Sequence, residues 1–190
     1  MKKLKIAFSG SHSTGKTTLI NEIKTKLPIK DFGYVSDIAS ECPLPILREH
    51  TIYSTLWITC RNISDEIALS HKYTLTLVDR PVLDAWAYYA AALYINSKKT
   101  EYDNLYNRKS NIMLYNIINE WLPSYDYIYQ TEINQNIKIN PEKNRDTDEE
   151  YRTIVGNECK KAIEFFGIKY CLITTDNRKQ ILRKVLSDIM

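Results

Sequence analysis

The sequence predicts a three-layer α/β domain, in which a parallel β-sheet lies between layers of helices. Segments typical of strands and of helices alternate along the whole chain. A glycine-bounded loop, residues 10–17, connects the first expected strand to the first expected helix. The chain has 190 residues and contains no internal repeat or low-complexity linker. We therefore expect residues 1–190 to form one domain that binds its ligands at the carboxyl ends of the strands.

The first half of the chain contains three expected strands, each followed by a helix. Apolar and β-branched runs predict the strands, and apolar residues at helical spacing predict the helices. Proline marks the end of the first helix and the start of the third. The expected segments are a strand at Leu4–Ser9, a helix at Lys16–Lys26, a strand at Tyr34–Ser36, a helix within Thr51–Lys72, a strand at Thr74–Val78 and a helix from Pro81 through Tyr94.

The expected helix within Thr51–Lys72 has two different faces. Apolar side chains recur at helical spacing on one face, at Ile52, Leu56, Cys60, Ile63 and Ile67. The other face carries Arg61, Asp65 and Glu66. Trp57 and Arg61 lie one helical turn apart and are candidates to line a base or ring pocket, with core packing as the alternative for Trp57.

The second half begins with a polar stretch, Asn96–Ser110, for which no element is expected. A second polar stretch, residues 131–147, is expected to be a mobile loop. Thr147 and Glu150 then form a capping-box pattern, and Gly167 is suited to end the helix that follows. The expected segments are a helix at Ile112–Trp121, a strand at Tyr125–Gln130, a helix from Tyr151 to Phe166, a strand at Lys169–Thr174 and a helix at Arg178–Ile189.

Composition excludes several classes of protein. Apolar residues make up 44%, charged residues 26%, and the net charge is +3, which does not favour a disordered, DNA-wrapping or membrane-surface protein. The four cysteines have no CxxC spacing, so we expect reduced thiols. The apolar stretch in MKKLKIAFSG is too short for a signal sequence or a spanning helix. We expect a cytoplasmic protein without a nucleic-acid partner or a membrane span. The composition leaves open whether the protein forms a homodimer.

The segment GSHSTGKT matches the phosphate-binding pattern GxxxxGK[ST]. Its glycines allow a backbone that turns successive N–H groups toward phosphate oxygens, and the next helix adds its positive end. Lys16 would reach the β- and γ-phosphates of ATP or GTP, and the Thr17 hydroxyl would ligate Mg²⁺. His12 occupies a free position, where we expect a solvent-facing side chain. The expected nucleotide-binding residues are Gly10, Ser11, His12, Ser13, Thr14, Gly15, Lys16, Thr17 and Thr175.

Missing motifs separate the classes of P-loop protein. The third strand is followed by Asp79-Arg80-Pro81, so the DxxG of a GTPase is absent, as is NKxD for guanine. There is no LSGGQ-type stretch of an ABC ATPase, and the chain is too short for the helical domain of the AAA⁺ machines. A small kinase remains as the favoured class.

Three segments resemble a known family: GSHSTGKTTL, VDRPVLDAWAYY and NRDTDEEYRTIVGNECKKAIEFFGIKYCLIT. They are similar to the AAA domain shared by NadR-type nicotinamide riboside kinases and Ttd14, and more distantly to thymidylate and deoxynucleoside kinases. The resemblance implies a nucleoside- or nucleotide-kinase-like P-loop fold, with Asp79-Arg80 beside the phosphates and a lid containing Arg145. Relatives often have a glutamate and, three residues later, an arginine after the second strand, where this chain has Asp37-Ile38-Ala39-Ser40.

Charged residues at strand ends supply the remaining site candidates. Asp79 is expected to bind Mg²⁺ or to accept the proton of an attacking hydroxyl, with a helix N-cap as the alternative. Asp37 is a candidate base for a sugar hydroxyl or a turn aspartate. Arg80 is a candidate to bind a substrate phosphate or carboxylate, or to make a surface salt bridge. Together with Lys16 and Arg145, the two aspartates are the catalytic candidates.

These observations predict transfer of the γ-phosphoryl group from Mg·ATP to a nucleoside, nucleotide or nicotinamide-riboside-like acceptor. Two other functions stay open. One is a nucleotide-binding regulator of the Ttd14 type, without a small-molecule acceptor. The other is a polynucleotide 5′-kinase, which the modest net charge disfavours.

Overall fold

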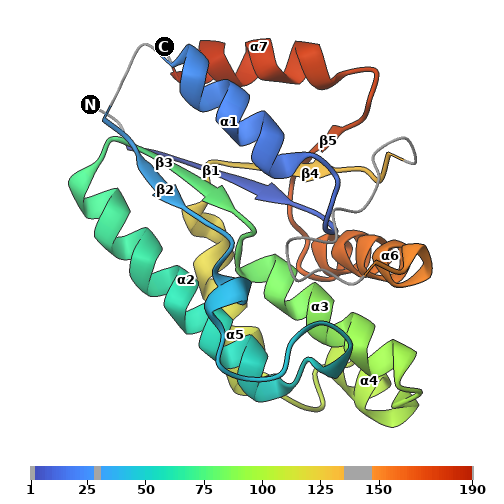
Figure 1. Ribbon diagram of the computed structural model, residues 1–190. Coiled ribbons are helices and arrows are strands. Elements are labelled where there is room, and N and C mark those ends of the chain that lie inside the picture. Colours follow the sequence, from blue (N-terminus) through green and yellow to red (C-terminus); the bar gives the residue numbers. More distant parts are fainter. Residues whose placement is uncertain (1–2, 28–30, 135–146, 190) are drawn as a thin grey trace.

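The computed structural model describes residues 3–27, 31–134 and 147–189, and these form an α/β fold around a five-stranded sheet (Figure 1). The strand order is β2-β3-β1-β4-β5, and every neighbouring pair is parallel. The strands are β1 (Leu4–Ser9), β2 (Gly33–Val35), β3 (Leu75–Asp79), β4 (Tyr127–Thr131) and β5 (Cys171–Ile173).

Helices cover both faces of this sheet (Figure 1). The first and last helices, α1 (Lys16–Lys26) and α7 (Arg178–Ile189), lie together on one face. The other face carries α2 (Ile52–Lys72), α3 (Val82–Ile95), α4 (Lys99–Tyr106), α5 (Ile112–Trp121) and α6 (Glu149–Phe165), with short 3₁₀ turns at Ile38–Glu41, Leu47–Glu49 and Leu122–Ser124. The predicted three-layer α/β fold is confirmed.

Two apolar cores hold the layers together, one on each face of the sheet. In β1 the side chains alternate between them, because successive residues of a strand point to opposite faces. Ile6 and Phe8 pack beneath α1 and α7, whereas Ala7 packs against the helices of the other face. Trp86 of α3, fully buried, stacks against Phe165 of α6, which fixes these two helices to each other.

The strand register gathers the residues that follow the strands at one edge of the sheet. Phe8 of β1 pairs with Asp79 of β3, and Ser9 pairs with Gln130 of β4. The loop after β1 therefore starts between the ends of β3 and β4. This edge is where parallel sheets of this type bind ligands.

The structure corrects two expectations about elements. The polar stretch Asn96–Ser110 contains the helix α4. Its Leu105 is fully buried in the core, and the hydroxyls of Tyr102 and Tyr106 donate to the Glu158 carboxylate of α6 at 2.7 and 2.6 Å. The N-cap of α6 is Asp148, whose side chain accepts from the backbone N–H of Glu150, and not the expected Thr147. Gly167, in contrast, has the left-handed φ of 64° expected of a residue that ends a helix.

The buried face of α2 differs from its most apolar face. Cys60 and Ile67 of the apolar series are exposed, while Asn62 and Glu66 are buried. Burial of Glu66 is balanced by hydrogen bonds from three side chains: those of Lys5, Trp121 and Tyr125. Neither α2 nor any other helix in the described ranges has the length and apolar character needed to span a membrane.

Candidate functional site

The loop between β1 and α1 has the backbone expected of a phosphate-binding loop. Gly10 and Gly15 have φ angles of 130° and 84°, which favour glycine. A Cβ at Gly10 would lie 2.5 Å from the Thr131 hydroxyl oxygen, so only glycine lets the loop approach the end of β4 this closely. The Thr14 hydroxyl lies 2.6 Å from that of Thr131, which in turn donates to the Ser9 carbonyl. The loop is therefore fixed to the sheet edge and fits a bound phosphate chain.

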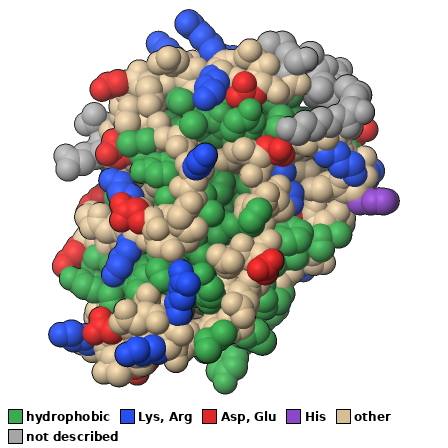
Figure 2. Space-filling view, turned by 180° about the vertical axis from the view of Figure 1, so that it is seen from behind, with side chains coloured by type: hydrophobic (Ala, Val, Ile, Leu, Met, Phe, Trp, Pro, Cys, Tyr) green, Lys and Arg blue, Asp and Glu red, His purple; other side chains and the backbone are tan. Residues whose placement is uncertain are grey.

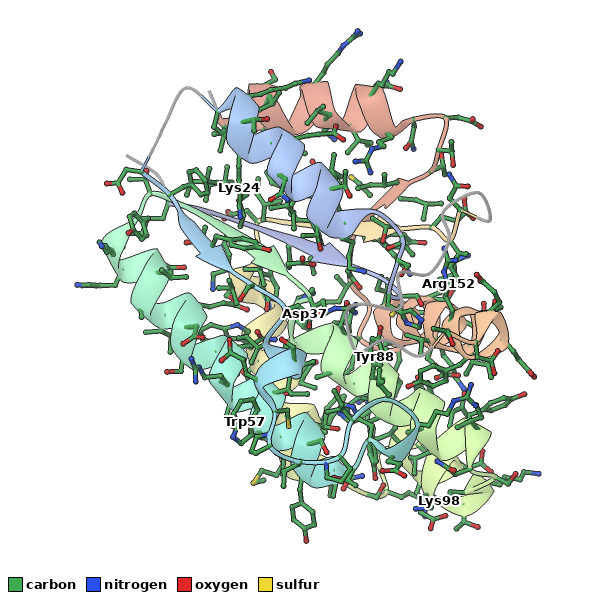
Figure 3. All side chains as sticks on the ribbon, in the orientation of Figure 1. Lys24, Asp37, Trp57, Tyr88, Lys98 and Arg152 are labelled. Carbon is green, nitrogen blue, oxygen red and sulfur yellow. The ribbon has the colours of Figure 1, made fainter. Side chains whose placement is uncertain are left out.

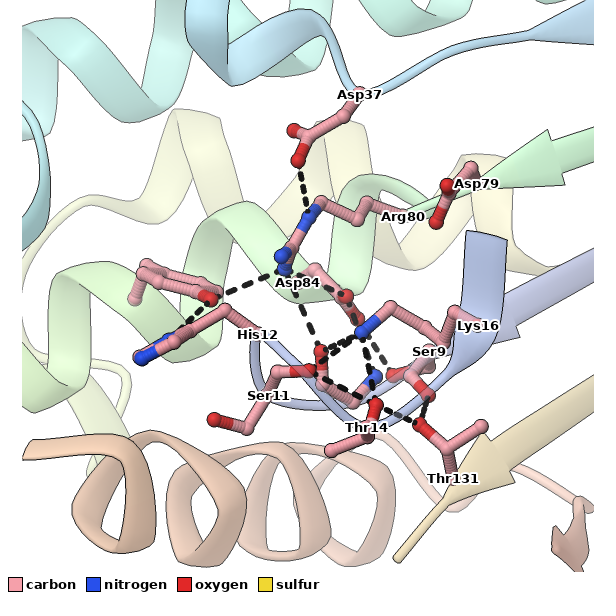
Figure 4. Close-up of polar contacts among 12 residues, drawn as sticks. Ser9, Ser11, His12, Thr14, Lys16, Asp37, Asp79, Arg80, Asp84 and Thr131 are labelled. Carbon is pink, nitrogen blue, oxygen red and sulfur yellow. Dashed lines mark hydrogen bonds and ion pairs between the residues drawn. The ribbon is translucent and has the colours of Figure 1, made fainter. Parts of the chain in front are cut away.

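Lys16 points its ammonium group into the concave side of this loop (Figure 4). Its Nζ donates to the carbonyl oxygens of Gly10 and Ser11 at 2.7 and 2.5 Å. Burial, followed by the nearby positive charge of Arg80, lowers the pKa of Lys16 to about 8. At pH 7 the side chain still carries the positive charge that phosphate oxygens require.

His12 is buried rather than exposed to solvent, which corrects the expectation for its side chain. Its Nδ1 lies 3.3 Å from the hydroxyl of Tyr88 on α3. The same loop is held from the other side by Arg152 of α6, a residue that the sequence did not single out. Its Nη2 donates to the Ser13 carbonyl at 3.0 Å, and its own carbonyl accepts from the Ser11 hydroxyl. Helices α3 and α6 thus both fix the loop.

Thr17 and Asp79 form a hydroxyl–carboxylate pair beside the loop. The Thr17 hydroxyl donates to Asp79 Oδ2 at 2.8 Å. Asp79 is 2% exposed, and within the described part of the chain its Oδ1 has no hydrogen-bond partner. Oxygen ligands of this kind are those that Mg²⁺ prefers, so these two residues fit a bound Mg²⁺. The alternative role as a helix cap is not observed, because Pro81 is the N-cap of α3 and none of the described side chains caps this helix.

Arg80 and Asp37 form an ion pair next to the loop (Figure 4). Arg80 Nε donates to Asp37 Oδ2 at 2.7 Å, and Arg80 Nη1 donates to the Tyr88 hydroxyl at 3.0 Å. The backbone of Arg80 has a φ of 71°, which is costly for a side-chain-bearing residue. Asn62 supports this conformation, because its Nδ2 donates to the Arg80 carbonyl at 3.1 Å. The guanidinium is therefore fixed and is not part of a surface salt bridge.

Asp84 connects the ion pair to the loop and was also missed by the sequence reasoning. Its carboxylate accepts from the Ser9 hydroxyl at 2.5 Å and from the backbone N–H of Gly10 at 3.3 Å, and lies 3.7 Å from Arg80 Nη1. Burial raises its pKa to about 6 against the opposing effects of Lys16 and Arg80. Its position in the first turn of the helix that follows Asp79-Arg80 was the signal that could have identified it.

A cavity opens beside these residues. The space within it, including the part that is open to solvent, is about 780 Å³. Charged and polar groups line one part of it, and apolar side chains line much of the remainder. The lining residues that matter below are Asp37, Ile38, Leu47, His50, Ile58, Asn62, Arg80, Asp84, Ala85 and Tyr88.

Two residues expected at this cavity lie elsewhere. Trp57 packs against the core on the α2 side, away from Asp37 and Tyr88 (Figure 3). Arg61 pairs with Asp65 and Glu41 on the surface. Neither residue lines the cavity. The cavity is lined instead by the residue that follows each of them on the helix, Ile58 and Asn62.

The remaining candidates lie after β4 and β5. Thr175 is exposed in the turn between β5 and α7. This turn is tied to the phosphate loop by Arg178, whose Nη1 donates to the Gly15 carbonyl at 3.3 Å. Arg145 and most of the expected lid, residues 131–147, lie outside the described residues.

No protein-family profile and no curated protein matches this sequence. Solved structures match over nearly the whole chain. Deoxyadenosine kinase from M. mycoides with bound dATP matches 98% of this chain and 99% of its own, with 15% identity and a TM-score of 0.66. The NadR protein in complex with NR gives 13% identity and a TM-score of 0.67; the match covers 98% of this chain and 50% of that one.

A third match is thymidylate kinase from Ehrlichia chaffeensis, with 11% identity, a TM-score of 0.60, and coverage of 97% and 99% of the two chains. At these identities the likeness concerns the fold. It agrees with the loop, strand order and helix layers described above. The chain has the P-loop fold found in nucleoside and nucleotide kinases.

Proposed function

We propose that this protein is an ATP-dependent kinase that transfers the γ-phosphoryl group to a hydroxyl of a small nucleoside-like acceptor. One observation carries the proposal: the fixed Asp37–Arg80 pair lies between the phosphate loop and a cavity that has both polar and apolar walls. A protein that only hydrolyses nucleotide has no need of such an acceptor cavity. The three structural neighbours named above, two kinases and NadR, support the same class of reaction.

The loop and its neighbours would hold the nucleotide. Backbone N–H groups of residues 10–17 and the N-terminus of α1 bind phosphate oxygens, and Lys16 adds a positive charge to them. Thr17 and Asp79 would hold Mg²⁺, and when bound this ion neutralises negative charge on the phosphate oxygens. In this arrangement the protein mainly positions and neutralises groups.

Asp37 and Arg80 would act on the acceptor. A carboxylate oxygen of Asp37 accepts the proton of the acceptor hydroxyl as that oxygen bonds to the γ-phosphorus; the bond from the phosphorus to its bridging oxygen breaks, and the electron pair leaves with ADP. Arg80 orients the carboxylate through its 2.7 Å hydrogen bond and is held in place by Tyr88 and Asn62. The apolar wall of the cavity reduces the access of water to the γ-phosphate.

The test is an ATP-consumption assay on the purified protein with Mg·ATP and a panel of nucleosides, nucleoside monophosphates, nicotinamide riboside and 5′-hydroxyl oligonucleotides. We expect one acceptor to raise the rate at least about tenfold over the rate without acceptor. Asp37→Asn should abolish this rise while ATP affinity stays nearly unchanged, because the amide can still accept a hydrogen bond from Arg80 but cannot accept the proton.

Two outcomes would redirect the proposal. If no acceptor stimulates ATP consumption and the nucleotide state instead controls binding to a partner, the loop serves a regulatory switch. If only oligonucleotides act as acceptors, the protein is a polynucleotide kinase. The face seen in Figure 2 gives no support to the latter, because positive and negative side chains are interspersed there and form no continuous basic patch.

A further inference from the structure

Asn62 has a buried hydrogen-bond acceptor that its neighbours in the protein do not use. The residue is 2% exposed and lines the cavity. Its Nδ2 donates to the Arg80 carbonyl, which fixes the orientation of the amide, and its Oδ1 has no partner within the described part of the chain. A buried acceptor without a partner is costly and uncommon in folded proteins. Because Asn62 is part of a cavity wall, a ligand that donates a hydrogen bond would satisfy this oxygen.

His50 is a second buried polar group in the same wall. The residue is 6% exposed, and among the described atoms its Nε2 has no hydrogen-bond partner. Burial lowers the pKa of its ring to about 4, so the ring is neutral at pH 7 and has one donor and one acceptor nitrogen. Such a ring can recognise the polar edge of a ligand without attracting a negative charge.

These two groups lie toward different ends of the cavity. Asn62 is beside Arg80, which faces the phosphate loop. His50 precedes α2, and about 15 Å of helix separates Ile52 from Asn62 at 1.5 Å per residue. Apolar side chains, with Ile58 on the same helix and Leu47 among them, line the cavity as well. The cavity therefore suits an elongated molecule with a polar group near the phosphates, an apolar middle and a second polar edge.

The charges of the cavity disfavour an anion. Among the described residues that line it, there are two carboxylates, Asp37 and Asp84, and one guanidinium, Arg80. That guanidinium already binds Asp37 and the Tyr88 hydroxyl. An acceptor that carries its own phosphate would be brought close to both carboxylates, and like charges in contact are strongly unfavourable.

We propose that the acceptor is a nucleoside without a phosphate group, and that Asn62 and His50 determine its selection. Asn62 Oδ1 accepts a hydrogen bond from a sugar hydroxyl, because Asn62 lies at the end where the sugar must meet the phosphate loop. His50 forms a hydrogen bond with the edge of the base at the opposite end. This inference rests on the proposed kinase function and specifies the acceptor of the same site.

The first experiment measures binding by calorimetry on the full chain with AMP-PNP present. The probes are adenosine, guanosine, cytidine, thymidine and nicotinamide riboside, each compared with its own 5′-monophosphate. We expect at least one nucleoside to bind at least about tenfold more tightly than its monophosphate. Equal or tighter binding of the monophosphates, or no binding by any nucleoside, would overturn the inference.

The second experiment tests the roles of Asn62 and His50. It uses the nucleoside that binds, together with its 2′-deoxy and 3′-deoxy forms. In the wild type, loss of the recognised hydroxyl should weaken binding about tenfold, whereas Asn62→Leu should bind both forms equally. His50→Phe, which keeps a ring of similar shape, should reduce discrimination between bases about tenfold. Thr59→Val is the matched control, because Thr59 is a buried α2 residue with an unpaired hydroxyl among the described atoms but does not line the cavity.

A purely structural role of the two residues would lower the melting temperature of the variants and leave their ligand discrimination as in the wild type, which would refute the proposal. The kinase function is tested separately. If binding is selective and depends on Asn62 and His50 but no phosphoryl transfer occurs, this inference is supported and the proposed kinase function is refuted. If the protein phosphorylates a nucleoside and the KM for that nucleoside is unchanged in Asn62→Leu, the kinase function is supported and this inference is refuted.

Discussion

His50 should make the protein less stable in mild acid. Burial lowers the pKa of this ring from 6.5 to about 4. Between these two pH values the unfolded chain binds a proton that the folded protein does not, so unfolding becomes more favourable as the pH falls. The stabilisation is fully present above about pH 6.5. A difference of 2.5 units at 1.36 kcal/mol each gives a total loss of about 3 kcal/mol by pH 4.

Asp84 acts in the opposite direction over nearly the same range. Burial raises its pKa from 3.8 to about 6, so the folded protein binds a proton here before the unfolded chain does. Its ionisation therefore destabilises the protein at pH 7, and about 3 kcal/mol is recovered as the pH falls from about 6 to below 4. In the wild type the effects of these two groups nearly cancel, and a pH profile of the wild type alone reveals neither.

The assay compares urea unfolding of His50→Gln with that of the wild type at several values between pH 4 and pH 8, so that all other titrating groups cancel. We expect the unfolding free energy of the variant, relative to the wild type, to rise by about 3 kcal/mol from pH 7 to pH 4. A constant difference for His50→Gln would mean that the ring is not held neutral by burial, and the reasoning would fail.

Three further predictions concern the phosphate side of the site. Lys16→Met should lower the rate of phosphoryl transfer at least about a hundredfold in a folded protein, and an undiminished rate would remove its assigned role. Asp79→Asn should remove the Mg²⁺ dependence of nucleotide binding, measured by titration, yet hardly change the urea midpoint, because Asp79 caps no helix. Gly10→Ala should destabilise the protein by at least about 2 kcal/mol, because the φ of 130° and the contact with Thr131 both oppose a side chain. Gly167→Ala is the control: it has open space around it and should cost about 1 kcal/mol. Equal costs for the two variants would contradict the close approach of Gly10 to Thr131.

The fold could be predicted because its signals are local. Each strand is a short apolar run, and each expected helix has apolar residues at helical spacing, so the order of these elements follows from the sequence. Strand ends differed from the expectation by one or two residues at most positions, where local signals are weakest. Helix α4 was missed because it is short and mostly polar: only Tyr102, Leu105 and Tyr106 recur at helical spacing, and two of them also reach Glu158, far along the chain.

The candidate site could be predicted only where a motif fixes the spacing. The loop from Gly10 to Thr17 has such a motif, and topology alone brings Asp37 close to Arg80. The acceptor side has no motif. The face of α2 that carries polar residues can be buried because groups on other elements form hydrogen bonds with them. The Arg80 carbonyl, for example, accepts from Asn62. Hydrophobic periodicity assigns the wrong face in such a case. Trp57 and Arg61 were chosen because they lie one helical turn apart, and each is one residue away from Ile58 and Asn62, which line the cavity.

The nucleotide loop and the acceptor cavity share one set of hydrogen bonds, and this should couple their ligands. Asp84 lines the cavity and also accepts from the Gly10 N–H at the start of the loop. Arg80 lines the cavity and donates to the Gly10 carbonyl at 3.4 Å. Lys16 donates to the same carbonyl. If a bound phosphate draws the Lys16 ammonium away, the Gly10 carbonyl keeps Arg80 as its side-chain donor. Nucleotide binding therefore changes the charge balance that the acceptor meets, and reciprocity requires the acceptor to change nucleotide affinity by the same factor.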